Sequence, residues 1–118
     1  MTSRVFAPAL LYLMSGVTYA VVPADCGGLS TKHFSWAALK VYPPRPSNPQ
    51  SEAWAKAQEA KGASHYIAEY CKDGRLVSLT KRLNKAVFFR YDYSYDGNKL
   101  VELRVTDETG KSEIVTSK

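Results

Sequence analysis

The sequence predicts an α+β fold: one short helix packed on a five-stranded antiparallel meander, preceded by a cleaved signal peptide and a Pro-rich linker. Three observations support this prediction. The chain opens with a charged residue and a short apolar run, a stretch rich in proline and glycine follows, and after Ser64 the apolar residues alternate with polar ones instead of repeating at helical spacing. A helix followed by a run of strands is typical of an α+β domain.

Residues 1–20 have the order of a secretory signal. Arg4 supplies the positive start, residues 5–17 form the apolar run, and small residues follow up to Ala20 and Ala24. The run is shorter than the roughly 20 apolar residues that a membrane-spanning helix requires. We therefore expect cleavage after Ala20 or Ala24, a periplasmic or secreted protein, and no stable membrane insertion after cleavage.

The charge of the chain narrows the class of partner. Lys and Arg number 16 against 11 Asp and Glu, and removal of the signal takes only Arg4 from the net charge of +5. In the cytoplasm, a basic chain rich in tyrosine would indicate nucleic acid. Outside it, the same charge favours solubility or an acidic protein surface. The sequence thus predicts a protein partner and no nucleic acid.

Cys26 and Cys71 are the two cysteines of the chain. In an oxidising compartment an even count is normally paired, so we expect a disulfide between them. Closing a loop of about 45 residues stabilises a fold by about 4 kcal/mol in the chain-entropy model.

Proline and glycine dominate residues 25–50, where four prolines and two glycines flank one apolar patch. Because proline restricts its own backbone and that of the preceding residue, this stretch is expected to be a stiff linker. Residues 51–118 are expected to form the folded domain.

A helix is predicted next, capped by Asn48, with Pro49 in its first turn and Gly62 ending it after Lys61. Trp54 is the one bulky residue of its apolar stripe, whose other members are Ala53, Ala57 and Ala60.

Short turns separate the expected strands, and most of these turns contain Gly or Asn, which tolerate positive φ. Connections this short make neighbouring strands antiparallel, which gives a meander. The expected strands are residues 65–71, 75–83, 86–95, 100–106 and 112–116.

Alternation assigns the two faces of this sheet. One face is apolar and aromatic, and we expect it to meet the helix. Its members are Val77, Leu79, Leu83, Val87, Phe89, Tyr91, Tyr93, Tyr95, Val101, Leu103 and Val105. The other face is mostly charged, with Arg82, Arg90, Asp92, Glu102 and Arg104 placed to pair across strands.

Two interpretations of the charged face stay open. It is either a solvated surface with ion pairs that each contribute less than about 1 kcal/mol, or a recognition surface in which arginines beside tyrosines anchor a partner. Bulky side chains on strand 86–95 exceed what one short helix covers, so Tyr93 or Tyr95 is expected to be exposed. The candidate partner-binding residues are Arg82, Arg90, Asp92, Arg104, Tyr93 and Tyr95.

Catalytic and metal-binding motifs are missing from the sequence. His33 and His65 are the only histidines, and neither has a companion at metal-ligand spacing. No nucleophile elbow, phosphate-binding loop or zinc-protease motif is present. We expect no catalytic residue, no metal site and no cofactor.

Residues 93–100 read Y-S-Y-D-G-N-K-L, and residues 105–110 read V-T-D-E-T-G. Together they resemble one unit of the tyrosine-aspartate (YD) repeats of Rhs-type proteins, and residues 70–76, Y-C-K-D-G-R-L, resemble a degraded second copy. The resemblance covers residues 70–116 and implies paired hairpins. It carries no catalytic residues. Long arrays of these repeats form shells around toxins, which two units cannot do.

The overall plan of signal, disulfide, helix and small sheet also resembles the small periplasmic immunity proteins that bacteria keep against interbacterial toxins. This resemblance implies an exported protein that binds and neutralises a cognate toxin stoichiometrically. Two alternatives stay open: an envelope structural or assembly module, and a small hydrolase.

Overall fold

The structure, a computed structural model, describes residues 22–117. The predicted signal peptide, residues 1–20, lies outside the described residues. No helix among residues 22–117 is long and apolar enough to cross a membrane.

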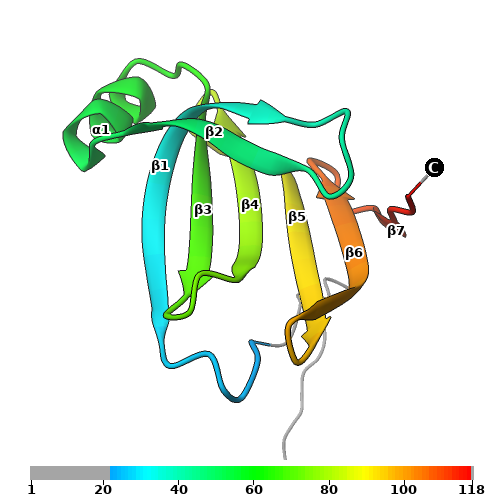
Figure 1. Cartoon of the computed structure of the whole chain (residues 1–118). Helices are drawn as coiled ribbons and strands as arrows, with labels where there is room; N and C mark the ends of the chain where they lie inside the picture. Colours follow the sequence, from blue (N-terminus) through cyan, green and yellow to red (C-terminus); the bar gives the residue numbers. More distant parts are fainter. Residues whose placement is uncertain (1–21, 118) are drawn as a thin grey trace, which may run out of the picture.

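All the strands belong to one antiparallel sheet of seven strands, in the spatial order β2-β1-β3-β4-β5-β6-β7 (Figure 1). The α+β class is confirmed, but the sheet has seven strands where five were predicted. The elements in chain order are β1 (Leu29–Ala38), β2 (Arg45–Gln50), α1 (Glu52–Ala60), β3 (His65–Cys71), β4 (Leu76–Leu83), β5 (Ala86–Asp96), β6 (Lys99–Asp107) and β7 (Ser112–Ile114).

The two additional strands, β1 and β2, lie in residues 25–50, so the linker predicted there is wrong. They form a hairpin in which Phe34 pairs with Pro49 and Ala37 with Pro46. Proline is tolerated because β2 is an edge strand, which pairs on one side only and can spare backbone donors. Composition reports only the local backbone preference of a segment, and pairing with a partner strand overrides that preference here.

The helix starts later than predicted, because β2 occupies Asn48 and Pro49. Ser51 is the N-cap, and its hydroxyl oxygen accepts a hydrogen bond from the Trp54 N–H at 3.1 Å. The stop at Gly62 is confirmed: Gly62 has a φ of 71°, and the Ala63 N–H reaches back to the Gln58 carbonyl oxygen at 2.9 Å.

The apolar core lies on one face of the sheet, called here the inner face; the opposite side is the outer face. The buried core residues are Phe34, Ala37, Tyr66, Ala68, Leu79, Tyr93 and Leu103, with Phe89, Tyr91, Tyr95 and Val115 packed against them. The predicted face is therefore right for these residues of β4, β5 and β6. Val87 and Val101 do not join this core and are 42% and 57% exposed. A register shift at Lys81/Arg82 disturbs the alternation near Val87.

The predicted packing of the helix on the apolar face is also wrong. Helix α1 lies at one end of the sheet beside β1 and β3 (Figure 1). Its Glu59 contacts Arg82 and His65, which belong to the outer face, and Ala55 is its one buried residue. Trp54, the predicted anchor, is half-buried and meets the His65 ring edge-on at 6.4 Å. The inner face is covered instead by the segment between β1 and β2, which arrives there because β1 continues past the end of β3.

The predicted disulfide is confirmed. Cys26 and Cys71 are bonded with their Cα atoms 4.7 Å apart, and they form a small buried cluster with Val77. Beside this bond, the guanidinium of Arg75 donates to the Asp25 carboxylate at 2.9 Å and to the Gly97 carbonyl oxygen at 2.7 Å. The bond and Arg75 together join the segment before β1 to the turns of both predicted hairpins.

Candidate functional site

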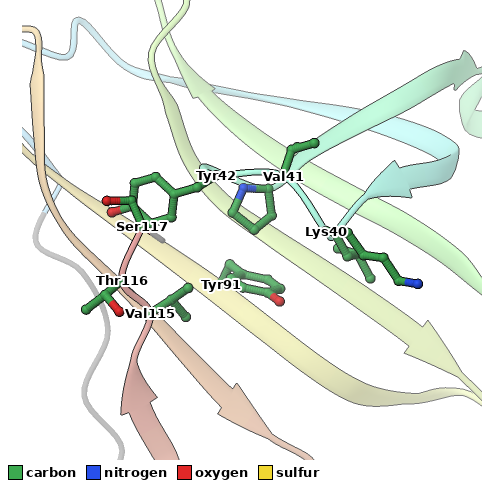
Figure 2. Close-up of a pocket in the computed structure, with 9 residues that line it drawn as sticks. Lys40, Val41, Tyr42, Tyr91, Val115, Thr116 and Ser117 are labelled. Atoms are coloured by element: carbon green, nitrogen blue, oxygen red, sulfur yellow. The ribbon is translucent and has the colours of Figure 1, made fainter.

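A groove of about 670 Å³ opens where the segment between β1 and β2 faces β5 and the residues after β7 (Figure 2). We call this segment, residues 39–44, the connector, and the hollow the connector groove. Its lining residues are Leu39, Lys40, Val41, Tyr42, Pro44, Tyr91, Val115, Thr116 and Ser117. The groove therefore joins three parts of the chain that are distant in sequence.

Hydrogen bonds from both walls fix the shape of this groove. The Tyr93 hydroxyl donates to the Pro44 carbonyl oxygen, which ties the connector to β5. On the other wall, the Val115 N–H donates to the Leu103 carbonyl oxygen at 2.8 Å, and the Val115 side chain packs against the core. Because both walls are attached to the same sheet, the groove is largely preformed.

Tyr91 forms the floor between the two walls (Figure 2). Its ring meets the Phe89 ring edge-on at 5.5 Å, so neighbouring aromatic packing holds it in place. Burial raises the pKa of the Tyr91 hydroxyl above its ordinary value, and nearby Tyr66 raises it further. The floor is thus a neutral aromatic surface with one hydroxyl group.

The rim of the groove exposes large apolar and aromatic side chains. Tyr42 is 42% exposed, and Val41 is similarly exposed. Trp36, on β1 before the connector and outside the lining of the groove, is 59% exposed. Tryptophan and tyrosine are the residue types that most often anchor protein interfaces. Lys40 is the one charged residue among those that line the groove. The arrangement suits a partner that offers an apolar side chain and an acidic one.

The arginines of the predicted recognition face each lie beside a carboxylate. Arg82 donates to both oxygens of Glu59 at 2.9 and 2.8 Å, Arg90 donates to Asp92 at 2.9 Å, and Arg104 donates to Glu102 at 3.3 Å. The pairs of Arg90 with Asp92 and of Arg104 with Glu102 lie within one strand, but Arg90 also lies 3.7 Å from Glu69 of β3, so its contacts are not confined to its own strand. Arg82 instead fastens α1 to β4.

The ion pair between Arg82 and Glu59 shifts the titration of both groups. The hydrogen bonds from Arg82 lower the pKa of Glu59 below its ordinary value, and those to Glu59 raise the pKa of Arg82. This pair holds the helix in position, so Arg82 has a structural role whether or not it also meets a partner.

The exposure predicted for Tyr93 or Tyr95 is wrong. Tyr93 is 1% exposed in the core, and Tyr95 is half-buried and donates to the Leu76 carbonyl oxygen at 2.8 Å. Asp92, a third candidate binding residue, is only 2% exposed. Tyr93 and Tyr95 are covered because the connector and Val115, and not the helix, lie on the inner face.

A second hollow, of about 270 Å³, lies under α1 on the outer face and is lined in part by His33, His65, Glu59 and Arg82. His65 is buried, and its Nε2 atom lies 3.8 Å from the nearer oxygen of Glu59. Within residues 22–117, no group of three His, Cys, Asp or Glu side chains is arranged to hold a metal ion. The Glu59–Arg82 pair that attaches α1 to β4 forms part of its wall.

Sequence reasoning missed the groove. Its connector wall was assigned to a linker, and its other wall to the end of a strand. The available signal was the apolar patch that ends at Tyr42, because apolar residues beside several prolines are unusual for a solvated linker.

Comparisons of the chain with family models, with curated proteins and with solved structures find no match. The resemblances to YD repeats and to immunity proteins stay predictions.

Proposed function

We propose that this protein is an exported binding protein that neutralises a secreted bacterial toxin by forming a stoichiometric complex, as immunity proteins do. The export is inferred from residues 1–20, and the toxin from the resemblance in plan to periplasmic immunity proteins. The protein itself is proposed to be a binder and not an enzyme.

The observation that carries the proposal is the connector groove with its exposed rim. An aromatic floor at Tyr91 and exposed Val41 and Tyr42 offer apolar area that the side chains of residues 22–117 leave uncovered. The Tyr93–Pro44 and Val115–Leu103 hydrogen bonds attach both walls of this groove to one continuous antiparallel sheet. A preformed surface loses little conformational entropy when a partner binds, which favours a tight complex.

We expect the partner to contact the groove and not the arginine face. Each arginine of the outer face already lies beside a carboxylate, and displacing such a pair to bind a partner costs desolvation. The groove offers apolar and aromatic groups without that cost. A toxin would meet this rim and lose access to its substrate.

Contact-dependent competition tests the proposed function. A strain that lacks the gene is grown in contact with its parent, and we expect the parent to kill the mutant. Expression of the full chain with residues 1–20 restores survival, whereas expression without residues 1–20 does not, because the chain must reach the compartment where the toxin acts. Equal survival of mutant and parent contradicts the proposal.

The same strains distinguish the proposed immunity function from a role in envelope structure or assembly. An immunity protein is dispensable when no toxin is delivered, so the mutant grown alone is expected to have an intact envelope. Leakage of periplasmic enzymes or sensitivity to detergent in the mutant alone, together with equal survival in competition, would assign the protein to envelope assembly instead.

A further inference from the structure

We infer that the open edge of β7 receives an extended segment of the partner protein as an additional strand, which places an apolar side chain in the connector groove and an acidic side chain beside Lys40. The inference deepens the proposed function, on which it rests in naming a protein as the partner.

Hydrogen bonds between β6 and β7 show which backbone groups of the edge are open. The Val115 N–H donates to the Leu103 carbonyl oxygen, and the Asp107 N–H donates to the Lys111 carbonyl oxygen. Antiparallel pairs alternate between bonded and non-bonded positions. Ser112 and Ile114 occupy the non-bonded positions opposite Thr106 and Arg104. Their N–H and C=O groups therefore point away from β6, where a further strand would pair.

The other edge of the sheet is less able to accept a strand. β2 contains Pro46 and Pro49 within its six residues, and proline has no N–H to donate. Natural sheets commonly use edge prolines to prevent pairing with other chains. No proline lies in β7 or in residues 115–117. The two edges differ in a way that leaves β7 as the accepting edge.

The connector groove continues directly from this open edge. Val115 follows β7 and forms one wall of the groove, with the Tyr91 floor beside it (Figure 2). Side chains directly opposite each other on neighbouring strands lie on the same face. A strand added to β7 therefore places its inner-face side chains next to Val115, at the mouth of the groove. Backbone pairing and an apolar pocket together are the recognition mode of strand addition.

Charge favours an acidic segment of another protein over a second copy of this chain. Lys40 is the one charged residue that lines the groove, and it has no carboxylate partner among residues 22–117. The full chain carries a net charge of +5. A second copy brings like charge to this rim, whereas an acidic side chain complements Lys40.

Two synthetic peptides with capped ends test the inference. One has the sequence Thr-Glu-Thr-Leu-Thr-Thr-Thr, which in an antiparallel pairing keeps its Glu away from Glu113 of β7, and the other has Lys in place of the Glu. Amide hydrogen exchange of the full chain is followed by NMR with each peptide. We expect the acidic peptide to slow exchange at Ser112 and Ile114 and the basic peptide to bind at least about tenfold more weakly. Equal binding of both peptides, or protection at β2 instead, overturns the inference.

Two variants sharpen this test. Ile114→Pro removes one outward N–H and leaves the Val115 hydrogen bond to β6, so it should abolish peptide binding, while Ile114→Ala should retain it. Lys40→Glu should reverse the preference and make the basic peptide the tighter ligand. The Lys40→Glu reversal decides the question even if Ile114→Pro does not fold. Slow exchange at Ile114 that depends on protein concentration without peptide would show a second copy at the edge and overturn the inference.

The competition assay distinguishes a failure of strand addition at β7 from a failure of the proposed immunity function. If exported Ile114→Pro is folded and still protects the mutant strain, the function stands and strand addition at β7 is wrong. If the peptides behave as expected but the chain gives no protection, strand addition stands and the immunity function is wrong.

Discussion

The hydroxyl of Tyr93 in β5 donates a hydrogen bond to the carbonyl oxygen of Pro44, which lies 49 residues earlier in the chain. This bond attaches the connector to the inner face and so forms one wall of the groove. Burial raises the pKa of Tyr93 well above its ordinary value, so the hydroxyl stays protonated and remains a donor at neutral pH. The bond links the core of the fold directly to the candidate site.

Tyr93→Phe is expected to lower the free energy of unfolding by about 1–3 kcal/mol, because it leaves the buried Pro44 carbonyl oxygen without its partner. Urea denaturation measures the change. Tyr42→Phe is the matched control, since it removes the same atom from an exposed side chain and should change stability by less than about 0.5 kcal/mol. Equal effects of the two variants would show that the bond does not hold the connector.

The pair between Glu59 and Arg82 predicts a loss of stability in acid. The pKa of Glu59 is lowered in the folded state by the hydrogen bonds from Arg82, whereas the unfolded chain has the ordinary value of 4.5. Below pH 4.5 the Glu59 carboxylate is protonated more fully in the unfolded chain than in the folded one. The pair with Arg82 therefore stabilises the fold above pH 4.5, and this stabilisation is lost as pH falls through the lowered pKa of the folded state. The melting temperature of Glu59→Gln should be below that of the parent at neutral pH, and the difference should shrink in acid.

Glu52→Gln is the control for the Glu59 experiment. Glu52 is in the same helix but lies 3.7 Å from the exposed Lys56 amino group, in a pair that contributes little. Its melting temperature should follow that of the parent at every pH. A Glu59→Gln difference that stays constant in acid would show that the loss comes from helix packing and not from the charge.

Replacement of both cysteines by serine is expected to lower the free energy of unfolding by about 4 kcal/mol, as the chain-entropy model gives for the 45-residue separation of Cys26 and Cys71. Denaturation of the parent under reducing conditions should give the same loss. A loss below about 1 kcal/mol would mean that Arg75 and the sheet hold the segment before β1 without the covalent bond.

Capture of the toxin by single variants distinguishes the groove from the arginine face. Tyr42→Ala should weaken capture by at least tenfold, about 1.4 kcal/mol, with an unchanged melting temperature, because Tyr42 lies exposed on the groove rim. Arg104→Ala tests the outer face and should leave capture within about threefold of the parent. The reverse pattern would return the contact to the arginines. Arg82→Ala is unsuitable, because Arg82 also holds α1 through Glu59.

Features that depend on neighbours in sequence were predictable. The bounds of β3, the stop at Gly62 and the Gly74 and Gly97 turns match the structure, and these glycines have positive φ. The disulfide was also predictable, because two cysteines have only one way to pair. The alternation of apolar and polar residues correctly predicted that Leu79, Tyr93 and Leu103 belong to the core. Successive side chains of a strand point to opposite faces of the sheet, whichever segment covers those faces.

Features that depend on distant pairing were decided only by the tertiary structure. Residues 25–50 contain strands because β1 pairs with β3, from Leu29 opposite Cys71 to Phe34 opposite Tyr66. Cross-strand pairs of this kind supply the stabilisation of a sheet. The connector then covered the inner face, which buried Tyr93 and created the groove beside Val115. By itself the sequence determined the turns at Gly62, Gly74 and Gly97 and the inner-face positions of β5 from Phe89 to Tyr95. Which segment would cover the inner face depended on contacts between residues far apart in the chain, and no local pattern records them.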